Sequence, residues 1–174
     1  MAEKYYNTTH IHPFCWDLVA NAIFLRYPNP MATHVLSEDT VFREVRNNGK
    51  VLYSRRFLTK TNKLPKWGER WMPAHLYRFV PLVEESYVDR DNKTVTTYTR
   101  NVGLSTFMTA TERVLYQPNP DNPEETIALK EAWVSTKNMN TQKLLKTLEG
   151  TNHFYLGLFN SIGRVEALWL AYCC

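Results

Sequence analysis

The stretch "HVLSEDTVFREVRNNGKVLYSRRFLTKT", residues 34–61, decides the class of fold. Apolar and polar residues alternate on both sides of "NNGK", which is typical of β-strands whose successive side chains point to opposite faces. Asn48-Gly49 is the expected central pair of the connecting turn, because both residue types tolerate the positive φ angles of tight hairpin turns. The stretch therefore predicts two antiparallel strands, over 34–45 and 51–61.

The rest of the chain extends this pattern. Further alternating runs, separated by turn-rich segments such as "QPNPDNPEE", occupy residues 4–12, 77–89, 93–102, 107–117 and 125–136. Apolar residues at helical spacing predict a helix over 15–26, a short helix over 65–72 and a late helix over 141–149. Consecutive strands with short turns form antiparallel meanders. The sequence thus predicts an α+β fold with a curved antiparallel sheet of about seven strands, closed by helices.

Composition limits the class of protein. The chain has 174 residues, 44% of them hydrophobic and 22% charged, which fits one globular domain spanning residues 1–174. The net charge of +4 favours binding to an acidic partner surface but is too small to indicate a nucleic-acid partner. Cys15, Cys173 and Cys174 form no disulfide framework or zinc-site spacing. No apolar run reaches membrane-spanning length, so we expect a soluble protein.

Motifs for enzyme chemistry are absent from the sequence. It has no G-x-S-x-G, no H-E-x-x-H and no glycine loop that would hold a phosphate, so we expect no enzyme, no cofactor and no metal site. His10 and His12 share a strand face, but we interpret them as exposed residues rather than metal ligands. Cys15 is interpreted as a small apolar residue at a helix start rather than a nucleophile.

Carboxylates within the predicted strands suggest no acid–base pair. Glu84 and Glu85 are neighbours on one strand, so their side chains face opposite ways. Glu112 and Glu131 lie in the middle of strands, and we expect them to face solvent; pairing with Arg113 and Lys130 on neighbouring strands is the alternative.

A set of cations raises the central question. Arg56 and Lys60 have the same parity as Leu52 and Leu58, which places two cations on an apolar strand face, whereas Arg55 points the other way. A cation on such a face is unfavourable unless an anion meets it. Two interpretations remain open at this point: a solvated charged face, or a phosphate site at one end of an apolar cavity.

The order of several motifs favours the second interpretation. The chain carries "RYPNP" (26–30), "HVLSED" (34–39), "REV" (43–45), "SRRFLTKTNKLPKW" (54–67), "TTYTRN" (96–101) and "EAWVS" (131–135). In this order they resemble the PRELI/MSF1 family of lipid-transfer proteins of the mitochondrial intermembrane space, over about residues 4–136. The resemblance implies a sheet and helices around a lipid cavity, similar to START-like and phosphatidylinositol-transfer folds.

The resemblance also implies a function. The expected cargo is phosphatidic acid, moved from the outer to the inner mitochondrial membrane to support cardiolipin synthesis. The expected partners are a small helical-hairpin protein with twin cysteine motifs, which forms a heterodimer, and anionic membranes in transient contact. We expect no nucleic-acid partner.

Site residues follow by matching positions. The resemblance and the strand parity predict the residues that bind the lipid head group: Arg26, His34, Arg56, Lys60 and Lys63. The phosphate of this head group would be the anion that pairs with the cations. The segment "PKWGERWM", residues 65–72, is expected to act as a lid that contacts the membrane through Lys66, Trp67 and Trp71. The alternative for the two tryptophans is a core or partner contact.

Three other functions stay open. One is a carrier of phosphatidylserine from the same family. Another is a nucleic-acid-binding module that uses basic strands with aromatic neighbours such as Tyr53, Phe57 and Tyr98. A third is a purely structural partner of another protein. Residues 150–174 depart from the family pattern, because they contain three glycines and end in an apolar run, and are interpreted as an atypical C-terminal tail.

Overall fold

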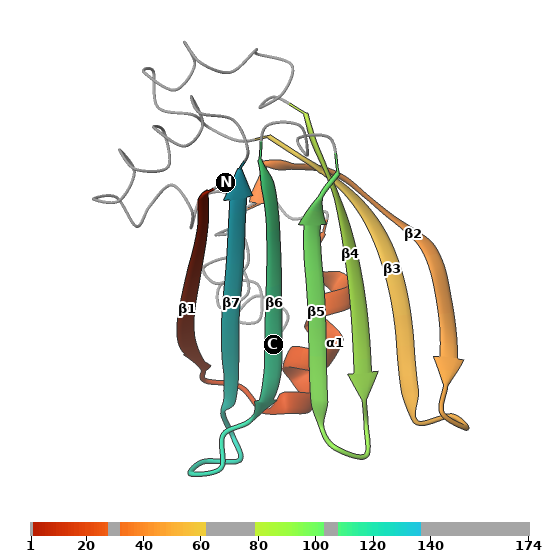
Figure 1. The fold of residues 1–174 in the computed structure, drawn as a ribbon. Helices are drawn as coiled ribbons and strands as arrows, with labels where there is room; N and C mark the ends of the chain where they lie inside the picture. The colour runs from red at the N-terminus through yellow and green to blue at the C-terminus, as the bar shows by residue number, and fades with distance from the viewer. Residues whose placement is uncertain (1, 28–31, 62–78, 103–107, 137–174) are drawn as a thin grey trace.

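The computed structural model describes residues 2–27, 32–61, 79–102 and 108–136. They form seven strands and one helix (Figure 1): β1 (Ala2–His12), α1 (Trp16–Leu25), β2 (Val35–Arg46), β3 (Val51–Lys60), β4 (Val80–Asp89), β5 (Thr94–Asn101), β6 (Thr109–Pro118) and β7 (Thr126–Thr136). All seven expected strands and the first helix are confirmed. The expected helices over 65–72 and 141–149, and the tail over 150–174, lie outside the described residues.

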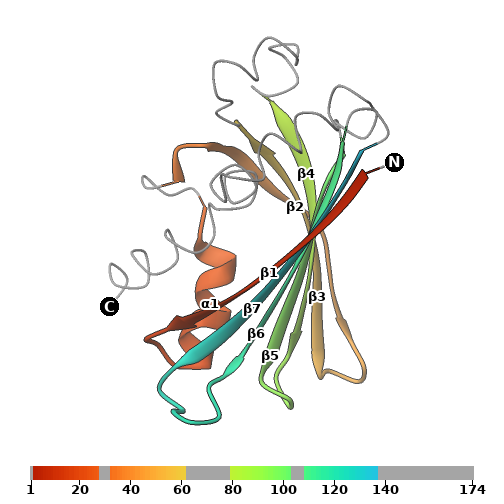
Figure 2. The ribbon, with the colours of Figure 1, turned by 60° about the vertical axis from the view of Figure 1, so that its left-hand side comes forward.

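The strands form one antiparallel sheet in the order β1-β7-β6-β5-β4-β3-β2. From β2 to β7 each strand pairs with the next along the chain, as a meander does, and β1 pairs with β7. The sheet is strongly twisted, and α1 packs on one side of it (Figure 2). We call the side that faces α1 the inner face and the opposite side the outer face.

The turn between β2 and β3 has the expected geometry. Asn48 and Gly49 have φ angles of 55° and 93°. The backbone N–H of Lys50 donates to the carbonyl of Asn47 at 3.2 Å, which makes Asn48 and Gly49 the central pair. Positive φ at both central positions matches the right-handed twist of the flanking strands. The sequence interpretation of this hairpin is confirmed.

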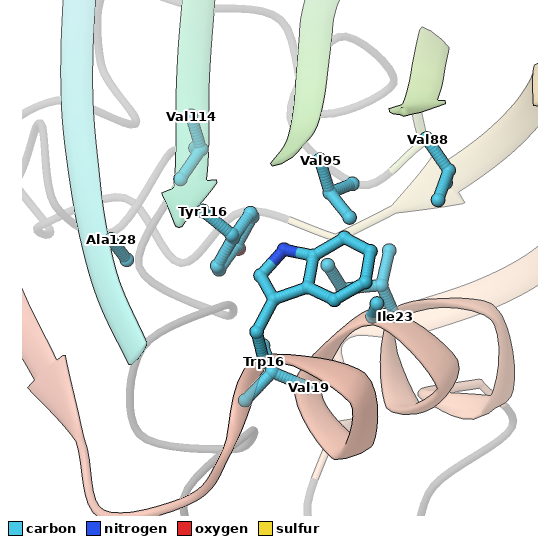
Figure 3. Close-up of a cluster of buried hydrophobic side chains, with 9 residues drawn as sticks. Trp16, Val19, Ile23, Val88, Val95, Val114, Tyr116 and Ala128 are labelled. Atoms are coloured by element: carbon cyan, nitrogen blue, oxygen red, sulfur yellow. The ribbon is translucent and has the colours of Figure 1, made fainter. Parts of the chain in front are cut away.

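Strand register arranges the inner-face side chains in rows across the sheet. One row is apolar and lies under α1, where Trp16, Val19 and Ile23 pack against it (Figure 3). These three helix residues are at most 5% exposed and recur at three- and four-residue spacing, which explains the amphipathic helix. The row itself consists of Leu52, Val88, Val95, Tyr116 and Ala128.

Two polar rows lie above this apolar cluster. The lower polar row is Ser54, Ser86, Thr97, Val114 and Lys130. The upper polar row is Arg56, Glu84, Thr99, Glu112 and Ala132. Beyond it the inner face becomes apolar again, with Leu58 and Leu82 in a second buried cluster. The inner face therefore has two apolar clusters with a polar belt between them. No helix among the described residues is long and apolar enough to span a membrane.

Candidate functional site

Arg55 and Arg56 lie on opposite faces of the sheet, as the strand alternation predicts. Arg55 is about half exposed on the outer face, where its guanidinium pairs with Glu85 at 2.9 Å. The side chain of Arg56 is 1% exposed on the inner face. Glu84 and Glu85 follow the same alternation, since Glu84 is buried on the inner face and Glu85 lies outside.

Carboxylates of the protein itself meet Arg56. Its Nε donates to Glu84 Oε1 at 3.0 Å, and its Nη2 also contacts this oxygen. Its Nη1 donates to Glu38 Oε1 at 2.6 Å and to the carbonyl of Ile23 at 3.1 Å. The last bond satisfies a carbonyl in the final turn of α1. Arg56 thus joins the helix to three strands, and Glu84 and Glu38 of the protein supply anionic partners that the sequence analysis did not assign to it.

Glu84 bridges two arginines. Its Oε2 contacts the guanidinium of Arg26, the residue that follows α1, while its Oε1 binds Arg56. Burial alone would raise the pKa of Glu84, but the charges of Arg26 and Arg56 outweigh burial and lower it to about 2. The carboxylate is therefore ionised at neutral pH and neutralises part of the two buried guanidinium charges.

The burial of Glu112 contradicts the expectation that this carboxylate faces solvent. It is not on a solvated face but is 1% exposed, and Lys130 approaches its Oε2 at 2.7 Å. Burial raises the pKa of Glu112, while the charges of Lys130 and Lys60 oppose that rise. Glu131 does pair with Arg113 at 2.7 Å on the outer face, where both side chains remain partly exposed. The alternative of pairing across strands therefore holds for both carboxylates.

Lys60 lies two residues beyond Leu58 on the inner face and is 3% exposed. Burial lowers the pKa of Lys60 to about 8, although the charge of Glu112 partly compensates, and the charge of Arg26 lowers it further. His34 is brought next to it by register, because Val35 pairs with Lys60. Burial and the charge of Lys60 lower the pKa of His34, so this imidazole is neutral at pH 7.

Seven charged side chains, none more than 12% exposed, form what we call the buried charge cluster: Arg26, Glu38, Arg56, Lys60, Glu84, Glu112 and Lys130. Among the described residues, the cluster holds four cations and three carboxylates. Isolated buried charge is strongly unfavourable, so a buried cluster rich in cations favours the binding of an anion.

Four of the five residues predicted for a head-group site lie in or beside the buried charge cluster: Arg26, His34, Arg56 and Lys60. Lys63 and the lid residues Lys66, Trp67 and Trp71 lie outside the described residues. Sequence reasoning missed Glu38, Glu84, Glu112 and Lys130 as members of the cluster. The available signal was the parity of the strand, because Glu84 lies on the same strand face as Leu82 and Val88.

The two histidines of β1 differ. His10 is exposed, but His12 is 3% exposed and packs 6.2 Å from the ring of Tyr116, so the expectation of an exposed pair is wrong for His12. Among the residues with described placement, no three His, Cys, Asp or Glu side chains group as metal ligands do. Cys15 is half-buried directly before α1, where the sequence analysis places it.

The aromatic residues considered for nucleic-acid binding lie on the outer face. Tyr53 is 2% exposed and donates a hydrogen bond from its hydroxyl to Glu85 at 2.6 Å. Phe57 and Tyr98 are each 40% exposed. The nearby cations Arg55 and Arg113 are paired with Glu85 and Glu131. These ion pairs reduce the positive charge that this face could offer to a phosphate backbone.

Comparison with known proteins decides the family. A sequence profile described as the PRELI-like family matches residues 17–153. The chain belongs to the PRELI-like family. That match covers most of the chain and includes every head-group residue predicted above.

Curated relatives of this PRELI-like chain carry consistent names. "PRELI domain-containing protein 1, mitochondrial" of Gallus gallus is 49% identical over 70% of this chain and 56% of its own length. The Homo sapiens protein of the same name is 45% identical over 76% and 60%. "Protein UPS1, mitochondrial" of Saccharomyces cerevisiae is 38% identical over 64% and 62%. The chain thus spans about three fifths of the length of these relatives.

Solved structures place the PRELI-like sheet in a wider fold group. The Zhui aromatase/cyclase of a Streptomyces species matches with a TM-score of 0.58 at 8% identity, over 98% of this chain and 94% of that one. Norcoclaurine synthase of Thalictrum flavum matches with a TM-score of 0.51 at 13% identity, over 98% and 87%. At such identities the likeness concerns the fold alone. The START-like architecture expected from the sequence is confirmed.

Proposed function

We propose that this chain is a phospholipid-transfer protein that carries phosphatidic acid from the outer to the inner mitochondrial membrane and so supports cardiolipin synthesis. It works in the intermembrane space as a heterodimer with a small twin-cysteine helical-hairpin protein, contacts anionic membranes transiently and catalyses no reaction. Family membership and the mitochondrial names of relatives support the compartment and the class of function.

One observation carries the choice of cargo: on a largely apolar inner face, the buried charge cluster holds four cations and three carboxylates among the described residues. A phosphate monoester has three acceptor oxygens and between one and two negative charges. It therefore suits a cationic belt. The apolar residues beyond the belt, such as Leu58 and Leu82, suit hydrocarbon, whereas the apolar row on the other side is covered by α1.

Apolar walls and charged groups contribute very different free energies to lipid binding. A diacyl lipid has roughly thirty methylenes, and each contributes about 0.8 kcal/mol on burial, so exposing the chains to water would cost on the order of 20 kcal/mol. Apolar walls must replace most of that. Charge-assisted hydrogen bonds, at about 1.5–3 kcal/mol each, cannot supply this sum. They can select one head group over another.

A vesicle-to-vesicle transfer assay tests the proposal. The chain, with its twin-cysteine partner, is mixed with donor vesicles that contain fluorescent phosphatidic acid, phosphatidylserine or phosphatidylcholine. We expect phosphatidic acid to move fastest. Faster movement of phosphatidylserine favours the alternative cargo of the same family. Movement of none of the three lipids contradicts a carrier function.

A further inference from the structure

Ser86 and Thr97 are a pair of buried hydroxyl residues with unmet hydrogen-bonding capacity. They face each other directly on β4 and β5 in the lower polar row, and each is 1% exposed. Neither hydroxyl has a hydrogen-bond partner among the residues that the structure describes. Buried side-chain hydroxyls are nearly always hydrogen-bonded. Two adjacent exceptions on one sheet face therefore point to something that binds them.

The surroundings of Ser86 and Thr97 indicate what kind of group could bind them. Below them on the same strands are Val88 and Val95, which belong to the apolar cluster under α1. Above them are Glu84 and Thr99 of the upper polar row. The indole nitrogen of Trp16, which is turned toward the strands in Figure 3, is a further buried donor without a partner among the described residues. These unmet groups thus lie where the apolar cluster meets the buried charge cluster.

A third hydroxyl in the row provides a contrast. Ser54, directly opposite Ser86, accepts a hydrogen bond from Arg43 Nε at 3.0 Å. The row is therefore not uniformly unsatisfied. Among the hydroxyls of this row, the unmet capacity is confined to β4 and β5, beside the carboxylate that bridges Arg26 and Arg56.

We propose that Ser86 and Thr97 form a neutral hydroxyl subsite that donates hydrogen bonds to unesterified oxygens of the cargo phosphate. A neutral pair adds no charge to the buried charge cluster beside it, so it responds to the number of free phosphate oxygens rather than to charge. A monoester offers three such oxygens and a diester two. This subsite is a head-group selectivity determinant for the cargo of the proposed function, and it rests on that function.

The test removes the hydroxyls and keeps the shape. The Ser86→Ala/Thr97→Val double variant is compared with wild type and with Thr96→Val, which alters the neighbouring residue on the outer face. With the twin-cysteine partner present, the assay follows transfer of phosphatidic acid and of phosphatidylmethanol with the same acyl chains. These lipids differ by one methyl group, which blocks one phosphate oxygen.

We expect the double variant to transfer phosphatidic acid about tenfold more slowly, the effect of losing one charge-assisted hydrogen bond. Transfer of phosphatidylmethanol should change much less, and Thr96→Val should behave as wild type. The lipid-free double variant should unfold at the same or a higher temperature, because apolar groups replace unsatisfied polar ones.

Three outcomes overturn the inference. An unchanged ratio of phosphatidic acid to phosphatidylmethanol transfer means that the hydroxyls do not read the phosphate. A lower unfolding temperature with a parallel loss of both transfers means that they hold structural water. If wild type moves neither lipid, the carrier function fails and the subsite fails with it. The behaviour of wild type therefore separates failure of the function from failure of the subsite alone.

Discussion

Arg56 and Glu84 face each other across β3 and β4, and the guanidinium reaches Oε1 of the carboxylate through both Nε, at 3.0 Å, and Nη2. Since the same arginine also binds Glu38 and the last turn of α1, its loss would leave several buried groups without partners. Such an arginine stabilises the fold in addition to any role toward cargo.

Arg56→Leu is expected to lower the free energy of unfolding by about 3–5 kcal/mol, the usual effect of removing one partner from a buried ion pair. Arg55→Leu, one residue away, provides the control, because its pair with Glu85 is solvent-exposed and should matter little. Urea denaturation of both variants measures the difference. Equal losses would contradict a special role for the inner-face pair.

Acid should unfold the protein partly through Glu84. The pKa of Glu84 is lowered to about 2 in the folded state, so its stabilising contribution is present above the ordinary pKa of 4.5 and is lost as the pH falls toward 2. Glu84→Gln should be less stable at pH 7, because Arg26 and Arg56 lose their shared carboxylate. Its stability should also fall less steeply between pH 4.5 and 2. Thermal unfolding across this range checks both statements, and parallel pH profiles would rule out Glu84 as the titrating group.

Lys60 should make lipid transfer depend on pH. With a pKa of about 8, the ammonium is charged at pH 7 and mostly neutral at pH 9, so transfer of phosphatidic acid should fall across this interval. The phosphate titrates near pH 6 and gains charge, so it cannot cause this fall. Lys60→Met should transfer about tenfold more slowly at pH 7, by loss of a charge-assisted hydrogen bond, and should show a flat profile. A fall of the same size in Lys60→Met would assign the titration to another group.

Membrane contact through the expected lid can be tested separately. Trp67→Ala should weaken association with anionic vesicles, because an indole ring favours the head-group region of a membrane. Flotation with vesicles and binding of the twin-cysteine partner are measured on the same sample. Reduced partner binding with unchanged flotation would make Trp67 a partner contact.

The sheet could be predicted from the sequence because its strands alternate and its turns carry recognisable residues. Asn48-Gly49 and the seven strand positions needed only local information. The burial of Glu112 and the double pairing of Glu84 did not follow, because they depend on which residues the register brings side by side. Arg56 and Glu84 are 28 residues apart in sequence. Strand parity alone places cations on the inner face, but the sequence analysis expects Glu112 to face solvent and assigns no cation to Glu84.

The pairing of β1 with β7 has a consequence for how the chain matures. Ala2 pairs with Thr136, so the first of the seven strands finds its partner only after the last of the seven has been made. The strands from β2 to β7 can add one neighbour at a time, whereas β1 must wait as an unpaired strand. Any truncation before residue 126 would remove that partner and leave β1 unpaired as well. Loss of the strand near one end of the sheet's sequence therefore leaves the strand at the other end without its pairing partner.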